Sequence, residues 1–153
     1  MLVHLKTKPP HQKMIDEHLP EFKEHRTCAF GSILFNPENV EMTPELMAHE
    51  MEHAKQQQTF GYSRHKLWKH SKYRVEEWWN RYLQDPSFRL AMELPASQRE
   101  WWEFQKYHTD RNRLEVKKHE IAKRLASKLY GKGIKVTEAL NVLDRNNLIK
   151  LNV

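Results

Sequence analysis

The stretch "TPELMAHEMEHAKQQQ", residues 43–58, decides the fold because it carries both a helix start and a pattern of buried helical positions. Thr43 is a favourable N-cap and Pro44 suits the first position of a helix, so the sequence predicts a helix from Pro44 to about Gln57. No glycine and no second proline interrupts these residues. The other elements of the chain can therefore be placed around one well-defined helix.

Two histidines share one face of this predicted helix. Successive helical residues turn by about 100°, so His49 and His53 lie about 40° apart. The same arc also holds Leu46, Gln57, Glu50, Met47, Met51 and Ala54. Two imidazoles one turn apart can bind zinc, and Glu50 beside them can take a proton from a metal-activated water.

The alternative is a polar helix whose histidines face water. The methionines on the same arc argue against it, because histidines without ligands would then carry polar nitrogens into the core without partners. We therefore favour a metal site built on this helix.

A zinc site of this kind needs at least one more protein ligand. The candidates are His65, His70, Glu76, Glu77, Glu93 and His108. The spacing of the sequence alone does not choose among them. A metzincin would have a histidine six residues after His53, but that position is Thr59, so this subclass is excluded.

The segments "MTPELMAHEMEHAKQQ" and "WWNRYLQDPSFRLAMELPA" resemble small gluzincin-type zinc metallopeptidases, particularly compact ones encoded by bacteriophages and bacteria. The resemblance covers about residues 27–107 and implies a minimal zincin-like fold, with a small hairpin or sheet packed on an active-site helix and a third-ligand helix. In gluzincins the third ligand is a glutamate, often in a Glu-x-x-Ala pattern, which "ELPAS" matches with Glu93 and Ala96. The resemblance thus implies that His49, His53 and Glu93 bind Zn²⁺.

The chain departs from the pattern of its small relatives, which tend to read Glu-x-Glu-Ala-Tyr, at Pro95 and Ser97. Pro95 lacks a backbone donor and is expected to interrupt the helix. Ser97 stands where larger relatives often have an acid and is expected to form a weaker hydrogen bond to a zinc-bound histidine. Tyr107 and His108 are candidates for the donor that stabilises the oxyanion of the reaction.

The rest of the chain predicts an α+β fold that is predominantly helical. Alternation in "TCAFGSILFNP" predicts one or two strands between residues 27 and 36. A short helix is expected at about Gln12–His18, an amphipathic helix around Trp78, another helix before Pro95 and one or two long helices after it. The side chains expected to face the interior are Leu46, Met47, Met51, Trp78, Tyr82 and Leu90.

Length and composition set the class of protein. With 153 residues and 39% hydrophobic residues, the chain fits one domain, 1–153. No run of 18 apolar residues is present, so we expect no membrane association. The first 25 residues lack the apolar region of a secretory signal. We therefore expect intracellular synthesis and, from the phage-like resemblance, a place in host cytoplasm or virion.

The net charge of +6 is concentrated in one segment. Residues 106–135 hold ten lysines and arginines against three acids, and this basic helical segment suits weak contact with nucleic acid or an acidic protein. A tail follows at 134–153, with a helical turn expected around Glu138–Leu143.

Two functions are compatible with these features. The first is a zinc-dependent peptidase that hydrolyses peptide bonds, with the peptide or protein substrate paired along the edge strand. The second is a non-catalytic phage virion or assembly protein with a structural or vestigial zinc site. A third function, nucleic-acid binding alone, is less compatible, because the sequence contains no recognised motif for reading bases. Activity that depends on Glu50 distinguishes the first two.

Overall fold

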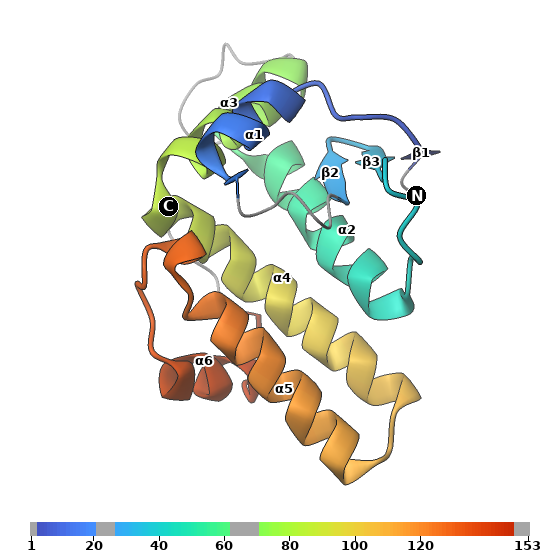
Figure 1. Cartoon of the computed structure of the whole chain (residues 1–153), viewed down its shortest axis with the longest axis vertical. Helices are drawn as coiled ribbons and strands as arrows, with labels where there is room; N and C mark the ends of the chain where they lie inside the picture. Colours follow the sequence, from blue (N-terminus) through green and yellow to red (C-terminus); the bar gives the residue numbers. More distant parts are fainter. Residues whose placement is uncertain (1–2, 21–26, 62–70, 149–153) are drawn as a thin grey trace. The chain divides into compact units, whose positions relative to one another are not determined.

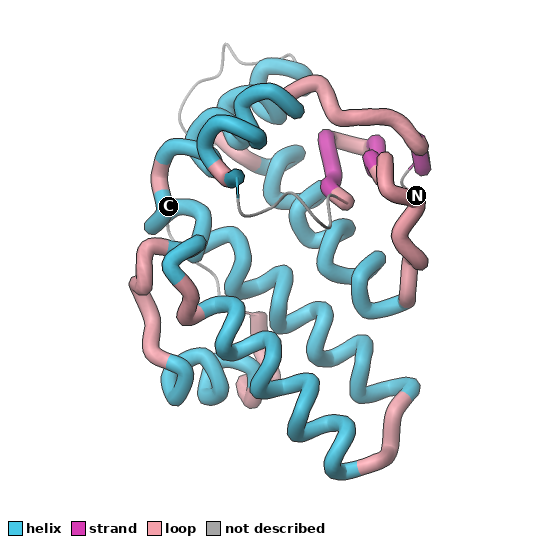
Figure 2. Tube along the Cα trace, in the orientation of Figure 1, coloured by secondary structure: helices cyan, strands magenta, loops and turns pink. Residues whose placement is uncertain are grey.

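The structure is a computed structural model, and it describes residues 3–20, 27–61 and 71–148. Helices dominate these residues and a small three-stranded sheet accompanies them (Figures 1 and 2). This confirms the predicted α+β class. None of the described helices combines the length and the apolar character that a membrane span requires.

The chain forms two compact units. Unit 1 comprises Met1–Glu41 and Glu50–Asp85, and unit 2 comprises Met42–His49 and Pro86–Val153. Helix α2 (Pro44–Thr59) begins in unit 2 and continues without a break into unit 1. The single domain over 1–153 and the limits of its core at about 27–107 stay predictions.

The sheet of unit 1 has the strand order β1-β3-β2. β2 (Cys28–Phe30) and β3 (Ile33–Phe35) form an antiparallel hairpin, which confirms the strands predicted between residues 27 and 36. Gly31 turns the chain with a φ of 61°, a conformation that glycine adopts at little cost. β1 (Val3–Leu5) pairs parallel to β3. Its three residues are all exposed, so no alternation marked it in the sequence.

Two further helices belong to unit 1. α1 (Gln12–His18) has the predicted bounds. α3 (Ser71–Gln84) buries an aromatic face, in which the Trp78 ring stacks on Tyr82 with centroids 4.8 Å apart. The buried hydrophobic residues of α3 are Val75, Trp78, Trp79, Tyr82 and Leu83. The interior positions predicted for Trp78 and Tyr82 are therefore confirmed.

Helix α2 starts as predicted, with the Leu46 N–H donating to Thr43 Oγ1 at 3.4 Å. Its buried arc consists of His49, Glu50, His53, Ala54 and Gln57. Leu46 and Met47 are half-buried, and Met51 is 44% exposed, so the interior position predicted for Met51 is wrong. On the helical wheel Met51 lies beyond the edge of that arc, which is centred on polar side chains rather than on the methionines.

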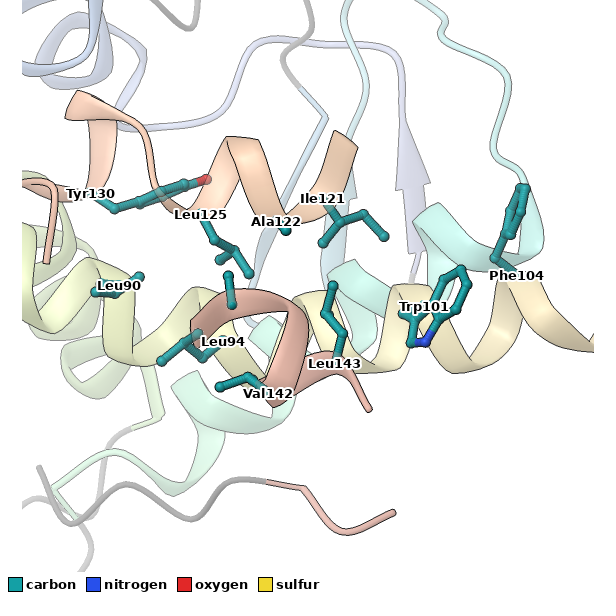
Figure 3. Close-up of a cluster of buried hydrophobic side chains, with 11 residues drawn as sticks. Leu90, Leu94, Trp101, Phe104, Ile121, Ala122, Leu125, Tyr130, Val142 and Leu143 are labelled. Atoms are coloured by element: carbon teal, nitrogen blue, oxygen red, sulfur yellow. The ribbon is translucent and has the colours of Figure 1, made fainter. Parts of the chain in front are cut away.

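Unit 2 is a helical layer with its own hydrophobic core. It contains most of the chain after residue 85, folded as α4 (Pro86–Tyr107), α5 (Arg111–Leu125), the 3-10 helix η2 (Lys128–Tyr130) and α6 (Val136–Leu143). Figure 3 shows the side chains of Leu90, Leu125 and Leu143 among those that meet in this core. The burial of Leu90 and the helical turn predicted at 138–143 are confirmed. The last residues of the predicted tail, 149–153, lie outside the described residues.

Pro95 lies inside α4 and does not end it, so the predicted interruption is wrong. Proline cannot donate to the carbonyl four residues earlier, but packing of a helix on both sides of the proline can compensate for that loss. Every residue from Met92 to Gln98 is buried, which provides this packing. Glu93 and Glu100 consequently belong to one continuous helix.

Candidate metal centre

His49 and His53 are both buried on α2, one helical turn apart as predicted. Each ring has an oxygen near Nδ1: Gln56 Oε1 forms a hydrogen bond with His53 Nδ1 at 2.9 Å, and Glu100 Oε2 lies 3.2 Å from His49 Nδ1 in an ion-pair contact. An acceptor at Nδ1 favours the tautomer with the proton on that atom. Nε2 is then the ring atom of each histidine that offers its lone pair to a metal ion.

Glu93, the third predicted ligand, is buried on α4 and its Oε2 lies 3.5 Å from His49 Nε2. Together with His53 it completes a buried group whose possible ligand atoms all lie within 4.8 Å of one another. Two ligands on a tetrahedral zinc ion are about 3.3 Å apart. The donor set and its spacing therefore fit a metal ion such as zinc.

The other candidates for the third ligand are not part of this group. Among the described residues, the group of metal-ligating side chains contains neither Glu76, Glu77 nor His108. His65 and His70 lie outside the described residues. Glu93 is thus the candidate that the structure brings to the histidines.

Glu100, which the sequence analysis missed, supports His49 from the side opposite Glu93. The carboxylate is buried and pairs with the Arg124 guanidinium and with Lys117 Nζ at 3.1 Å. Burial opposes its ionisation, but Arg124, His49 and Lys117 together hold the pKa of Glu100 well below its usual range. An ionised carboxylate therefore faces His49 Nδ1 and fixes the orientation of that ring.

Ser97 does not make the contact predicted for it. Its side chain is fully buried, and Ser97 Oγ has no hydrogen-bond partner within the part of the chain that the structure describes. The supporting carboxylate comes from Glu100, one turn farther along α4 than Ser97. Seven residues, or about two turns, separate Glu93 from Glu100, so both project from the same side of the helix. That spacing was the available signal in the sequence.

Tyr107 and His108 lie far from the group. Tyr107 is 14 residues beyond Glu93 on α4, a distance of about 21 Å along the helix axis. Its side chain is 61% exposed, and the His108 ring packs on Phe104 with centroids 4.1 Å apart. The structure therefore does not bring either predicted oxyanion donor to the metal-ligand candidates.

Tyr130 is the aromatic hydroxyl that does reach this group. It is buried in η2, and its hydroxyl donates to Glu93 Oε2 at 3.2 Å. Burial and the charge of Glu93 raise the pKa of Tyr130 well above its ordinary value, so the hydroxyl keeps its proton. The 37 residues that separate the pair explain why the sequence pattern did not reveal it.

Glu50 is buried next to His49, and its Oε2 accepts the backbone N–H of Ala29 at 2.8 Å. The Ala29 carbonyl accepts from Gln57 Nε2 at 2.8 Å and from Trp79 Nε1 at 3.2 Å. These groups of β2 point away from β3, and β2 is one of the two edge strands, β1 and β2, to which the predicted substrate pairing applies. Backbone pairing of a substrate with Ala29 would have to replace these bonds.

Some bases of the basic segment, residues 106–135, form ion pairs with acidic residues of unit 2. Lys117 and Arg124 neutralise Glu100, and Lys118 Nζ pairs with Asp144 Oδ1 at 2.6 Å. Exposed bases of the segment include Arg111, Arg113, Lys123, Lys128 and Lys132. Lys106, Arg124 and Lys135 are exposed as well, so most bases of the segment lie at the surface, where a partner in solution can reach them.

Comparisons of the chain with protein-family models, curated proteins and solved structures gave no match.

Replacing Glu100 with glutamine is expected to weaken the binding of a metal ion such as zinc to this group by about 10- to 100-fold, because an amide orients and polarises His49 less well than a carboxylate. Competition with a zinc chelator measures this affinity. Glu103→Gln is the matched control, since Glu103 lies on the same helix and pairs with Lys106 at 2.5 Å. Equal zinc affinity in wild type and Glu100→Gln would contradict the role of Glu100.

Proposed function

We propose that the chain is a zinc-dependent peptidase of gluzincin type that acts on peptide or protein substrates. The observation that carries the proposal is the buried group of His49, His53 and Glu93, together with the buried Glu50, which follows His49 directly on α2. The two Nδ1 partners, Gln56 and Glu100, direct both rings toward metal binding through Nε2. Zinc held there would supply Lewis-acid activation of a water molecule and of the substrate carbonyl.

Glu50 acts as the general base in this proposal and accepts the proton of the attacking water. A carboxylate has two oxygens, so protonation of one leaves the other on the Ala29 N–H. This backbone bond holds the carboxylate in one orientation before the reaction. A positioned base of this kind contributes about 100- to 10,000-fold to the rate.

Tyr130 orients Glu93 through its hydrogen bond to Oε2. A neutral hydroxyl leaves the charge of the carboxylate intact, so Glu93 keeps its affinity for a cation. Glu100 is a second buried carboxylate near the group, in contact with His49. The positive charges of Arg124 and Lys117 balance the charge of Glu100.

The second candidate is a non-catalytic protein, such as a phage virion or assembly component, in which a metal at the same residues is structural. The bond between Glu50 and Ala29 favours this candidate, because it gives Glu50 a role in tying α2 to β2 without any chemistry. Metal content does not distinguish the two functions, whereas cleavage does.

The test is zinc analysis of the purified protein together with cleavage of a mixture of unstructured proteins. The peptidase proposal expects one zinc per chain, cleavage that a chelator abolishes and cleavage that added zinc restores. Stoichiometric zinc with no cleavage of any protein in the mixture would contradict it and support the structural candidate.

Any binding of nucleic acid by the basic segment is expected to be weak and to fall steeply as salt rises, because exposed bases meet phosphates without a base-reading element. Titration of duplex and single-stranded DNA at two salt concentrations measures it. Tight, sequence-selective binding that persists in high salt would contradict this expectation.

A further inference from the structure

Gln57 is the most completely buried polar side chain of α2, and the two ends of its amide bond to strand β2 and to the turn that follows it. Its Nε2 donates to the Ala29 carbonyl at 2.8 Å, and its Oε1 accepts the Gly31 N–H at 2.6 Å. The side chain therefore occupies one backbone group on the outer edge of β2 and one in the turn between β2 and β3. Buried amides bound in this way are costly to disturb.

Glu50 bonds to the same edge from the same helix. It lies seven residues before Gln57, about two turns, so both side chains project from one face of α2. Glu50 takes the Ala29 N–H, and Gln57 takes the Ala29 carbonyl and the Gly31 N–H. We call these two side chains with Ala29 and Gly31 the edge clamp.

The edge clamp fixes the register of α2 against β2. A slide of the strand by one residue would turn the Ala29 backbone groups toward β3 and break all three bonds at once. Trp79 Nε1 shares the Ala29 carbonyl, which gives this residue a further anchor from α3. The N–H that Glu50 uses is therefore held in place by bonds that Glu50 does not make.

We propose that Gln57 is a positioning residue for Glu50. By holding the Ala29 peptide it keeps the Ala29 N–H where it orients the Glu50 carboxylate. The inference rests on the proposed function, in which Glu50 is the general base. Gln57 itself is not part of the metal-ligand group, so its effect on metal binding separates positioning from general damage to the site.

The experiment compares Gln57→Ala and Gln57→Met with wild type. Methionine fills the volume of glutamine without its hydrogen bonds, which keeps the test available if the alanine variant folds poorly. Gln58→Ala is the control, because Gln58 is the exposed neighbour on the same helix. The measurements are zinc affinity, kcat, KM and the hydrogen-exchange rate of the Ala29 amide.

We expect both Gln57 variants to bind zinc as wild type does, to keep KM and to lose about 100-fold in kcat, the size of effect that a misplacement of about 1 Å produces. The Ala29 amide should exchange faster in both, and Gln58→Ala should match wild type throughout. Zinc affinity and kcat falling together would assign Gln57 a general structural role and overturn the proposal. An unchanged kcat with faster Ala29 exchange would overturn it as well.

The exchange measurement also separates this inference from the proposed function. If zinc-loaded wild type cleaves nothing, the peptidase proposal fails. The hydrogen-exchange rate of the Ala29 amide then decides by itself whether Gln57 positions Glu50. Faster exchange in Gln57→Met than in wild type supports the positioning role. Equal exchange in the two proteins overturns it.

Discussion

Glu50→Gln is expected to keep the fold and the bound zinc yet to lower the rate of peptide cleavage by about 100- to 10,000-fold. Glutamine is nearly isosteric with glutamate, and its amide oxygen can still accept the Ala29 N–H that Glu50 Oε2 accepts at 2.8 Å. It cannot accept a proton from water at neutral pH. The measurement is cleavage of an unstructured protein mixture at equal zinc occupancy.

Glu52→Gln is the matched control, since Glu52 lies on the same helix and pairs with Lys55 at 3.7 Å, outside the metal-ligand group. It removes the same charge from α2 and should cleave as wild type does. Cleavage by Glu50→Gln at the wild-type rate would show that Glu50 is not the general base.

His49→Ala is expected to lose zinc and activity together. A metal that binds only the folded protein stabilises it by about 4 kcal/mol when its free concentration is 1,000 times its dissociation constant. Wild type should gain stability of this order on saturation with zinc, and His49→Ala should gain far less. Denaturant unfolding with and without zinc measures the difference.

The control for this loss is His119→Ala, because His119 is a partly exposed histidine that pairs with Glu115 on α5. Zinc should stabilise this variant as much as wild type. If zinc stabilised His49→Ala to the same extent, the metal would bind elsewhere, and His49 would be a buried histidine held by Glu100.

The features that the sequence predicted correctly are local ones. Thr43 and Pro44 define the start of α2 through capping, and helical periodicity alone puts His49 and His53 on one buried face. The prediction of Glu93 as a ligand rests instead on the resemblance of "ELPAS" to a gluzincin pattern. In the structure Glu93 Oε2 lies 3.5 Å from His49 Nε2, within a group that could hold a metal ion.

The features that the sequence did not predict depend on contacts between distant residues. Tyr130 reaches Glu93 across 37 residues, and β1 joins the sheet with three exposed residues that show no alternation. Pro95 would break an isolated helix, but burial of its neighbours keeps α4 continuous. Helix propensity was a weaker determinant there than tertiary packing.

Glu100 shows how a charge pattern was misread. Lys117 and Arg124 belong to the basic segment, which in the sequence looks like a surface for acidic partners. In the structure these two bases neutralise the buried Glu100 carboxylate beside His49. One amino-acid sequence gives no signal of such ion pairs, because Lys117 and Arg124 lie 17 and 24 residues after Glu100.

Anomalous diffraction at the zinc absorption edge, from crystals of the zinc-loaded protein, locates the bound metal directly. We expect one strong peak bound by His49 Nε2, His53 Nε2 and a carboxylate oxygen of Glu93, with the Glu100 carboxylate next to His49 Nδ1. A peak at other residues, or zinc bound to the histidines with the Glu93 carboxylate turned away, would show that these three residues are not the metal ligands.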